Sequence, residues 1–309
     1  MIQLTELKSS SSTESEACPE VAIIVLNWNN YSDTAECLRS LKDIEYPNYC
    51  VYVVDNGSTD GSGERLEEEF PWCEFIFNHG NLGFAAGNNP AIDTAIEGEA
   101  SYVLLLNNDI QAEDGLLKPL VETAEKYEDT VIVGGVLLNE EGDVYSAGGD
   151  FNQITTRLKI DEEVDSSEFR TNFVSGAMLL ADSNFLKSVG GLSEYYFFGM
   201  EDQELAWKAK KEGKELRINS RSRAVHKIGG SSDRESPFRF YHATRNRLEF
   251  IRRNLFLPNR IIAYLFFIIT RVVRFIQWFF QGKTSKIKAV LLGMYDWILR
   301  EPFRRVSDF

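Results

Sequence analysis

The sequence predicts an α/β fold in which helices cover a mostly parallel sheet. Between residues 21 and 138, short apolar runs alternate with longer amphipathic stretches, the pattern of repeated strand–helix–strand units. The 309 residues, 43% of them hydrophobic, suffice for one large domain with an appendage. In sheets of this class, ligands bind beyond the carboxyl ends of the strands.

The apolar runs define the strands, and the amphipathic stretches define the helices. The expected strands are residues 21–26, 49–55, 74–77, 102–106 and 131–138, and the helices between them are residues 32–44, 60–70, 84–96 and 113–127. Pro90 is expected in the first turn of its helix, where its missing N–H costs no hydrogen bond. The Gly-rich stretch 141–165 suits a hairpin, and 172–180 a further strand. Residues 201–212 and 238–253 are expected to form helices.

Composition divides the chain into three expected parts. Residues 1–19 are rich in Ser, Glu and Thr and are expected to form a disordered leader without the features of a signal peptide. Residues 20–253 form the α/β domain, and residues 254–309 form a helical extension. The four cysteines show no CxxC spacing, which favours a reducing cytoplasmic setting over disulfides or zinc.

Charge is distributed unevenly along the chain. The net charge is −14, but residues 217–309 carry 19 basic and 6 acidic side chains, a balance of +13. Residues 255–280 are strongly apolar yet interrupted by Arg260, Arg271 and Arg274. Arginine at a bilayer centre costs roughly 2.5–3.5 kcal/mol, so the pattern favours a helix lying on an anionic membrane surface over a spanning helix. A helix hairpin packed on the domain is the alternative.

Polar residues follow the first two expected strands. NWNN (residues 27–30) comes after the first, and DNGSTDG (residues 55–61) after the second. Asp55 can accept a hydrogen bond from a base N–H, so a nucleotide site is one interpretation. A turn that caps the following helix is the other.

Two later segments add chemistry suited to a diphosphate. NLGFAAGNN (residues 81–89) opens a helix, where open N–H groups suit an anion or a sugar nucleotide. The strand 102–106 ends in NND (residues 107–109), and the carboxylate of Asp109 is suited to a divalent cation. An Asx turn would produce the same pattern.

A pair of carboxylates begins the helix 201–212. Glu201 and Asp202 follow an aromatic and Gly-containing stretch. Acidic residues at this position stabilise the helix dipole, and Asp202 can also serve as a general base from the first turn. His226, at the end of an expected strand, is a metal-ligand candidate, although a single histidine is more often structural.

Taken together, these segments resemble the inverting nucleotide-sugar glycosyltransferases of family 2, which have the GT-A fold. The resemblance spans roughly residues 20–250 and rests on VAIIVLNWNN, VVDNGSTDGS, NLGFAAGNN, LLLNNDI, FVSGAMLL and FFGMEDQEL in this order. Within the family, the chain looks most like the bacterial rhamnosyltransferase-type branch, which builds cell-surface polysaccharides. That resemblance implies a hexosyltransferase acting on a glycan or lipid-linked glycan acceptor at the inner face of the cell membrane.

The resemblance also implies roles for individual residues. Asp55 matches the residue that recognises the base, Asn108 a ribose contact, Asp109 the metal-binding carboxylate, and Asp202 the catalytic base with Glu201 beside it. His226 matches a histidine that completes the metal shell in some members. The expected nucleotide-binding residues are Asn27, Asn29, Asp55, Asn56, Ser58, Asn81, Gly83, Asn88, Asn107 and Asn108, and those near the sugars are Ser175, Gly176 and Ala177. The single carboxylate in NND, where the family motif has two, weakens the implied metal site.

The implied reaction is one in-line displacement. Asp202 takes the proton of the acceptor hydroxyl, and an unperturbed Asp pKa of about 3.9 would keep this side chain ionised at neutral pH. Mg²⁺ or Mn²⁺ on Asp109 would neutralise the leaving diphosphate. The donor is dTDP-rhamnose by resemblance, with UDP-linked hexoses and N-acetylhexosamines left open.

Three rival functions follow from the same residues. A non-catalytic module that binds sugar nucleotides or glycans would keep the strand-end loops without needing Asp202. A Rossmann dehydrogenase would need G-x-G-x-x-G after the first strand, and this motif is absent there. Nucleic-acid binding would use the basic third of the chain but would leave the acidic clusters without a role.

Overall fold

The computed structural model describes residues 18–164, 166–227, 236–300 and 303, so residues 1–17 of the expected leader lie outside the described residues. The strands are β1 (Val21–Asn27), β2 (Tyr49–Asp55), β3 (Glu74–Phe77), β4 (Tyr102–Asn107), β5 (Ile110–Ala112), β6 (Thr130–Leu138), β7 (Val144–Ser146), β8 (Gly149–Asn152), β9 (Arg157–Ile160), β10 (Glu168–Thr171), β11 (Met178–Asp182) and β12 (Glu215–His226). The helices are α1 (Tyr31–Leu41), α2 (Ser62–Glu69), α3 (Phe84–Glu97), α4 (Leu117–Lys126), α5 (Ser183–Val189), α6 (Glu201–Lys211), α7 (Pro237–Asn254), α8 (Asn259–Phe280) and α9 (Thr284–Leu299).

Among the described residues the central sheet is mixed rather than mostly parallel, because its four parallel strand pairs are accompanied by five antiparallel ones. Its strand order is β10-β12-β6-β11-β4-β1-β2-β3, and β1 pairs in parallel with both β2 and β4. Strand β11 runs antiparallel to its neighbours β4 and β6. The sheet therefore brings the carboxyl ends of β1, β2 and β4 to one edge.

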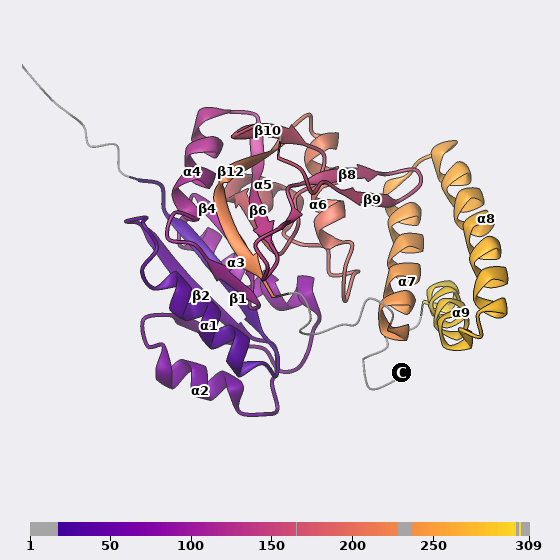
Figure 1. Cartoon of the computed structure of the whole chain (residues 1–309), viewed down its shortest axis with the longest axis horizontal. Coiled ribbons are helices and arrows are strands. Elements are labelled where there is room, and N and C mark those ends of the chain that lie inside the picture. The colour runs from indigo at the N-terminus through magenta and orange to yellow at the C-terminus, as the bar shows by residue number, and fades with distance from the viewer. Residues whose placement is uncertain (1–17, 165, 228–235, 301–302, 304–309) are drawn as a thin grey trace, which may run out of the picture.

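Helices cover both faces of the sheet and divide the core in two (Figure 1). Along β1, Val21, Ile23 and Val25 pack with α1, α2 and α4, whereas Ala22 and Ile24 pack with α3, α5 and α6. This alternation explains why β1 is apolar at every position before Asn27, because both of its faces are buried. The expected α/β class is confirmed.

Several local expectations need correction. Pro90 lies in the second turn of α3 rather than the first, because Gly83, with φ of 84°, ends the preceding loop and the helix starts at Phe84. The expected strand 172–180 is shorter and shifted, since β11 begins at Met178. The helix expected from residue 113 begins only at Leu117, because the preceding strand β5 pairs with β12 and a short turn separates it from the helix.

The C-terminal helices form a separate group beside the α/β layers (Figure 1). A third apolar cluster joins them to the domain through Phe151, Tyr196, Phe250 and Leu255. Helix α8 carries one continuous apolar stripe that faces outward, hereafter the outer stripe, and its side chains are 49–83% exposed. The outer stripe consists of Ile261, Ile262, Leu265, Ile268, Ile269, Val272, Val273, Ile276, Phe279 and Phe280.

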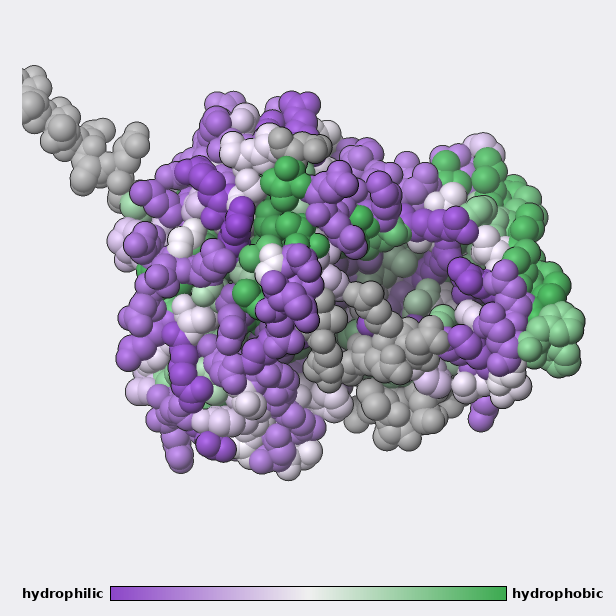
Figure 2. All heavy atoms as spheres, in the orientation of Figure 1, coloured by the Kyte–Doolittle hydropathy of each residue, from purple (hydrophilic) through white to green (hydrophobic). Residues whose placement is uncertain are grey.

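The arginines that interrupt this segment in the sequence lie on the opposite side of α8 from the outer stripe, as helical spacing requires. By length and composition, α8 is the single helix among the described residues that could cross a membrane, with a mean hydropathy of 1.6 and 17% of that window buried. Apolar side chains gather at the outer edge of the extension, over α8 (Figure 2).

Candidate active site

The ends of three neighbouring strands surround a cavity of about 180 Å³. Asn27 at the end of β1 is in register with Asp55 on β2, and Leu26 is in register with Asn107 on β4. Aromatic rings close the other side of the cavity. The lining consists of Leu26, Trp28, Asn30, Asn56, Asn81, Gly83, Phe84, Asn107, Asn108, Asp109, Phe197, Phe198 and Phe238.

Half of the expected nucleotide-binding residues line this cavity. Those that do are Asn56, Asn81, Gly83, Asn107 and Asn108, together with the expected metal ligand Asp109. Those that do not are Asn27, Asn29, Asp55, Ser58 and Asn88. Asn88 is buried within α3, where its Nδ2 donates to Phe84 O at 2.8 Å.

Asn27 and Asp55 form a buried hydrogen-bond network behind the cavity. Asn27 Nδ2 donates to Asp55 Oδ2 at 2.8 Å, and Thr34 Oγ1 donates to Asn27 Oδ1 at 2.8 Å. The other Asp55 oxygen accepts from Ser58 N at 2.8 Å. Asp55 is 4% exposed and in this arrangement it ties the loops after β1 and β2 together. Asn29 joins the same two loops, since its Oδ1 accepts from Thr59 N at 2.8 Å.

Asn56 positions the segment that precedes α3. Its Nδ2 donates to Gly83 O at 3.1 Å and to Asn81 Oδ1 at 3.2 Å. The N–H of Phe84 donates to Phe197 O at 2.9 Å. This N–H, at the start of α3, is therefore already satisfied by the protein rather than open to an anion.

Asp109 and His226 lie next to each other just beyond the C-terminal end of β4. Strand β5 pairs antiparallel with β12, and Ile110 is in register with His226. As a result, Asp109 Oδ1 lies 3.2 Å from His226 Nε2, and both side chains are largely buried. Neither Asp109 Oδ1 nor His226 Nδ1 has a hydrogen-bond partner among the described residues.

This pair suits a divalent cation as a partial ligand set. A carboxylate oxygen and an imidazole nitrogen are ligands that Mn²⁺ accepts, whereas Mg²⁺ prefers oxygen. The unpaired buried Oδ1 of Asp109 fits such a role. Among the described residues, no group of three or more His, Cys, Asp or Glu side chains is arranged to hold a metal. The remaining ligands would therefore have to come from substrate and water.

Asp202 is connected to this cavity by the 175–177 segment. Its Oδ2 accepts from Gly176 N at 3.1 Å, and Asn107 N donates to Ala177 O at 3.0 Å. Neither Glu201 nor Asp202 lines the cavity itself. The sugar-proximal residues that the sequence predicts thus lie between the expected base and the end of β4.

Burial changes the acidity of the first two carboxyl groups in α6, those of Glu201 and Asp202. It raises the pKa of Asp202 to about 6, although hydrogen bonds from Gly176 N and Gln203 N favour the ionised form. Burial also raises the pKa of Glu201, and the charge of Asp202 raises it further. The expectation of an unperturbed Asp202 pKa is therefore wrong, because the fold takes most of the water away from this partly exposed side chain.

Sequence reasoning missed the aromatic wall of the cavity. Phe197 and Phe198 lie in the FFGMEDQEL segment, but nothing in that segment indicates that they line a cavity. Phe238 comes from the first turn of α7, about 130 residues after the strand ends it faces, and nothing in its sequence context signals this contact. Its position depends on how α7 packs against the domain.

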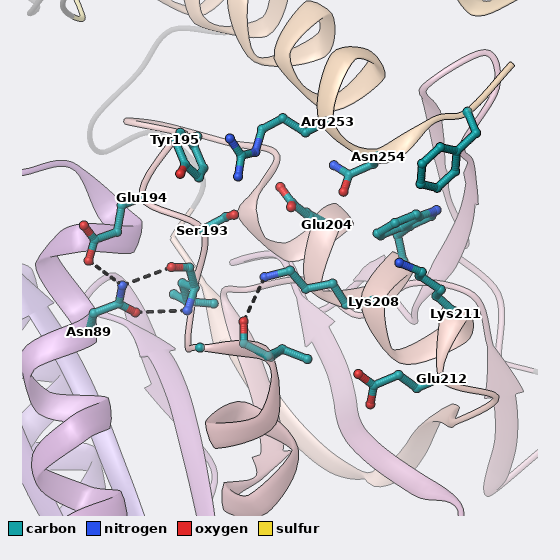
Figure 3. A pocket seen from close by; sticks show the side chains of 15 residues that line it. Asn89, Ser193, Glu194, Tyr195, Glu204, Lys208, Lys211, Glu212, Arg253 and Asn254 are labelled. Carbon is teal, nitrogen blue, oxygen red and sulfur yellow. Dashed lines mark hydrogen bonds between the residues drawn. The ribbon is translucent and has the colours of Figure 1, made fainter. Parts of the chain in front are cut away.

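A larger open cavity of about 810 Å³ lies on another side of α6 (Figure 3). Glu204, Trp207 and Lys208 of α6 line it together with Arg253 and Asn254 at the end of α7. Side chains two residues apart in an α-helix point in directions about 200° apart, so Asp202 and Glu204 point to different sides of α6. This cavity contains none of the site residues that the sequence predicts.

Comparisons with known proteins agree with the fold and the motifs. A family model described as Glycosyl transferase family 2 matches residues 22–184, more than half of the chain. The N-acetylglucosaminyl-diphospho-decaprenol L-rhamnosyltransferase of Mycobacterium tuberculosis (strain ATCC 25618 / H37Rv) is 28% identical over 189 residues, 53% of this chain and 61% of that protein. Glycosyltransferase GlyG of Streptococcus pneumoniae is 24% identical over 174 residues, 54% of this chain and 56% of that protein. The chain thus spans about three fifths of the length of these curated relatives.

Two solved structures share the fold at low sequence identity. The mannosyltransferase PcManGT from Pyrobaculum calidifontis, in complex with GDP-Man and Mn²⁺, has a TM-score of 0.57 at 15% identity, covering 93% of this chain and 89% of that one. GalNAc-T7 with UDP, GalNAc and Mn²⁺ has a TM-score of 0.62 at 14% identity, covering 74% of this chain and 48% of that one. The protein belongs to glycosyl transferase family 2, with a GT-A-type fold and a sequence similar to rhamnosyltransferases.

Proposed function

We propose that this protein transfers a sugar from a nucleoside-diphosphate donor to a hydroxyl group of a glycan or lipid-linked glycan in the synthesis of a cell-surface polysaccharide. One observation carries the proposal. Asp109, paired with His226, lines the cavity at the strand ends, and the 175–177 segment is hydrogen-bonded both to Asp202 and to Asn107, two residues before Asp109. A diphosphate site and a base are what a one-step transfer requires.

Asp202 acts as the general base in this proposal. It takes the proton of the acceptor hydroxyl while that oxygen bonds to the anomeric carbon and the bond to the diphosphate breaks, which inverts the anomeric configuration. The raised pKa of Asp202 makes it a stronger base than an ordinary aspartate, yet still ionised at neutral pH. Glu201 stays protonated beside it, because two ionised carboxylates in one buried site repel each other.

Asp109 and His226 would hold the divalent cation in this proposal. When bound, Mg²⁺ or Mn²⁺ supplies a Lewis acid that neutralises charge on the leaving diphosphate. Asn108 supports this end of the site, since its Nδ2 donates to Thr34 Oγ1 at 2.8 Å and fixes the loop. Two solved proteins of the same fold contain Mn²⁺ with a nucleotide or nucleotide sugar, which supports this assignment.

The cavity lining suits the nucleoside part of a donor. Phe84, Phe197 and Phe198 offer ring faces, and Asn56 and Asn81 offer amides beside them. The donor sugar we propose is rhamnose on dTDP, because the printed activity of the mycobacterial relative is rhamnosyl transfer. UDP-linked hexoses are the alternative donors.

We place the protein at the cytoplasmic face of a membrane, held by α8. The outer stripe of α8 exposes apolar side chains that the domain does not cover. The C-terminal third carries a net positive charge, which attracts anionic lipids. Such a position brings a lipid-linked acceptor to the site.

A panel of nucleotide sugars tests the proposal directly. We expect release of a nucleoside diphosphate from one donor, in the presence of Mg²⁺ or Mn²⁺, at a rate that an acceptor glycan increases. Binding of donors without any release, in wild type and in Asp202→Asn alike, would indicate a non-catalytic binding module instead.

A further inference from the structure

Three arginines meet where the β8–β9 hairpin reaches the C-terminal helices (Figure 1). The guanidinium of Arg157 on β9 lies 4.9 Å from the ring centre of Phe266 on α8. Arg247 of α7 and Arg271 of α8 lie 5.8 Å and 5.4 Å from the neighbouring ring of Phe267. Residues from a hairpin and two helices thus gather three positive charges around two adjacent rings.

This arginine cluster contains no anion of its own. Within the described residues, none of the three arginines forms an ion pair with a carboxylate. Arg247 donates to Thr155 O and Thr156 Oγ1 in the hairpin turn, whereas the buried Nε of Arg271 has no hydrogen-bond partner. Burial lowers the pKa of Arg247 to about 10 and also that of Arg271, and the neighbouring arginines lower both further.

Like charges gathered without a counter-ion are costly to fold, so an anion that binds them offsets this cost. Guanidinium groups form paired hydrogen bonds with phosphate oxygens, and several together suit a phosphate or diphosphate ester. The cluster lies on the side of α8 that faces the domain, and the outer stripe lies on the other side. The rings of Phe266 and Phe267 lie among the arginines, so a ligand that joins an apolar chain to a phosphate would contact rings and guanidinium groups together.

We propose that Arg157, Arg247 and Arg271 bind the phosphate or diphosphate group of a lipid-linked acceptor whose hydrocarbon chain lies along α8. The proposal rests on the proposed glycosyl transfer for the identity of the acceptor. A bulk phospholipid offers one phosphate diester, whereas a lipid diphosphate presents more charge and more oxygens to the three guanidinium groups. This chemistry favours the acceptor over the membrane lipids around it.

Binding of farnesyl diphosphate, a short lipid diphosphate, to the full chain tests the site by calorimetry. We expect Arg157→Gln and Arg271→Gln each to weaken binding roughly tenfold, because each removes charge-assisted hydrogen bonds to phosphate. Arg271→Lys, which keeps the charge but loses the planar fork, should also weaken it. Arg223→Gln, an exposed arginine of β12 outside the cluster, is the matched control and should bind as wild type does.

Two further measurements separate the site from a structural role and from the donor site. Arg271→Gln should melt at the same temperature as wild type or higher, because it removes a like charge; a lower melting temperature with unchanged binding would make the cluster structural. Asp109→Ala should leave farnesyl diphosphate binding unchanged. Loss of binding in that variant would place the ligand in the donor cavity and overturn the proposal.

The source of the phosphate is tested with two more probes. Weaker binding of inorganic pyrophosphate than of farnesyl diphosphate is expected, since the rings of Phe266 and Phe267 add contacts to the chain. Equally tight binding of dihexanoyl phosphatidylglycerol through the same arginines would assign the site to membrane lipids instead. Donor hydrolysis by the arginine variants should equal that of wild type, so failure of this site is distinguishable from failure of the transferase proposal.

Discussion

Asp202 combines two properties that oppose each other, a largely desolvated position and a proposed role that requires negative charge. The backbone N–H groups of Gly176 and Gln203 hold the carboxylate, but burial still makes ionisation unfavourable. A buried base of this kind gains basicity at the expense of stability. Both consequences can be measured in one substitution.

Asp202→Asn should lower turnover by roughly 10²–10⁴-fold, because general base catalysis typically contributes that much. Donor affinity should change little, since Asp202 does not line the donor cavity. Stopped assays of nucleoside diphosphate release, with calorimetry for donor binding, measure the two effects. Asp143→Asn, an exposed carboxylate outside the site, should behave as wild type; an equal loss of donor affinity and rate in Asp202→Asn would contradict the base assignment.

The same substitution should stabilise the fold above pH 6. The pKa of Asp202 is raised from 3.8 to about 6, so folding is penalised once pH exceeds the unfolded value, and the penalty is complete above the folded value. Asp202→Asn removes that penalty, and we expect a gain of the order of 1–3 kcal/mol at pH 8 and almost none at pH 4. Urea unfolding at the two pH values gives the difference, and an equal effect at both would argue against a raised pKa.

The pH dependence of catalysis should show the same group. If Asp202 must be ionised, kcat/KM should rise with pH up to about 6 and then level off. With an unshifted aspartate pKa, this rise in kcat/KM would occur near pH 4. With saturating Mn²⁺, kcat/KM of wild type should therefore rise between about pH 4 and pH 6. The residual kcat/KM of Asp202→Asn should not show this rise.

Asp109 and His226 should act together on donor binding. Asp109→Ala removes the carboxylate that faces His226 at 3.2 Å, so donor affinity should lose its dependence on Mn²⁺. His226→Ala should weaken the same dependence less, because it leaves the charged ligand in place. Calorimetry with and without Mn²⁺ decides the matter, and unchanged metal dependence in Asp109→Ala would place the cation elsewhere.

At the scale of elements, the start of α3 is fixed by a close approach of two backbones. Gly83 has φ of 84°, and a Cβ at this position would lie 2.3 Å from Phe197 O. The approach allows Phe84 N to donate to that oxygen and holds the Phe197 ring against the cavity. The segment before α6 and the segment before α3 therefore form one wall.

Gly83→Ala should separate these segments. Left-handed backbone strain for alanine costs roughly 1–3 kcal/mol, and the clash with Phe197 adds to it. Gly61→Ala is the control for a positive φ without a clash, because Gly61 has φ of 76° and ψ of 11° with open space around its Cβ position, whereas Gly83 has ψ of −175°, a region that side chains other than glycine rarely adopt. Thermal unfolding and donor affinity of the two variants should differ, with Gly83→Ala worse in both; equal effects would mean that strain alone matters.

The elements that the sequence predicts well are those whose pattern is local. Strand β1 and the NND turn after β4 follow from apolar runs that end abruptly, and that placement puts Asn107 and Asp109 at the cavity. Long-range packing is less predictable. The short strand β5 aligns Asp109 with His226 only through pairing with β12, and neither partner shows this in its own sequence.

The local sequence pattern also does not predict how side chains are oriented. Asp55 ends β2, the position expected of a residue that contacts the base. Its two carboxylate oxygens instead accept hydrogen bonds from Asn27 and Ser58. Phe238 reaches the cavity because α7 docks on the domain through Phe250 and its neighbours. Such contacts depend on tertiary packing, which no motif encodes.

At the scale of the whole molecule, the sheet and the C-terminal helices present different surfaces. Polar side chains cover most of the visible face of the α/β layers, whereas apolar side chains cover the outer edge of α8 (Figure 2). Isolated apolar residues are normal on soluble proteins, but a continuous stripe of ten is not. Its arginines lie away from the stripe on the helix surface, so the stripe can enter the acyl boundary without carrying charge into it.

The stripe should bind the protein to anionic vesicles. Leu265 and Ile269 lie at its centre and are 55% and 62% exposed, so Leu265→Glu and Ile269→Glu should each weaken co-sedimentation with phosphatidylglycerol vesicles about tenfold or more. Phe77→Glu, on the far edge strand β3 and 44% exposed, is the matched control and should sediment as wild type does. Donor hydrolysis in solution should be the same in all three variants, because none of these residues lines the cavity. If wild type stays in solution with these vesicles at low salt, the stripe must instead be covered by protein.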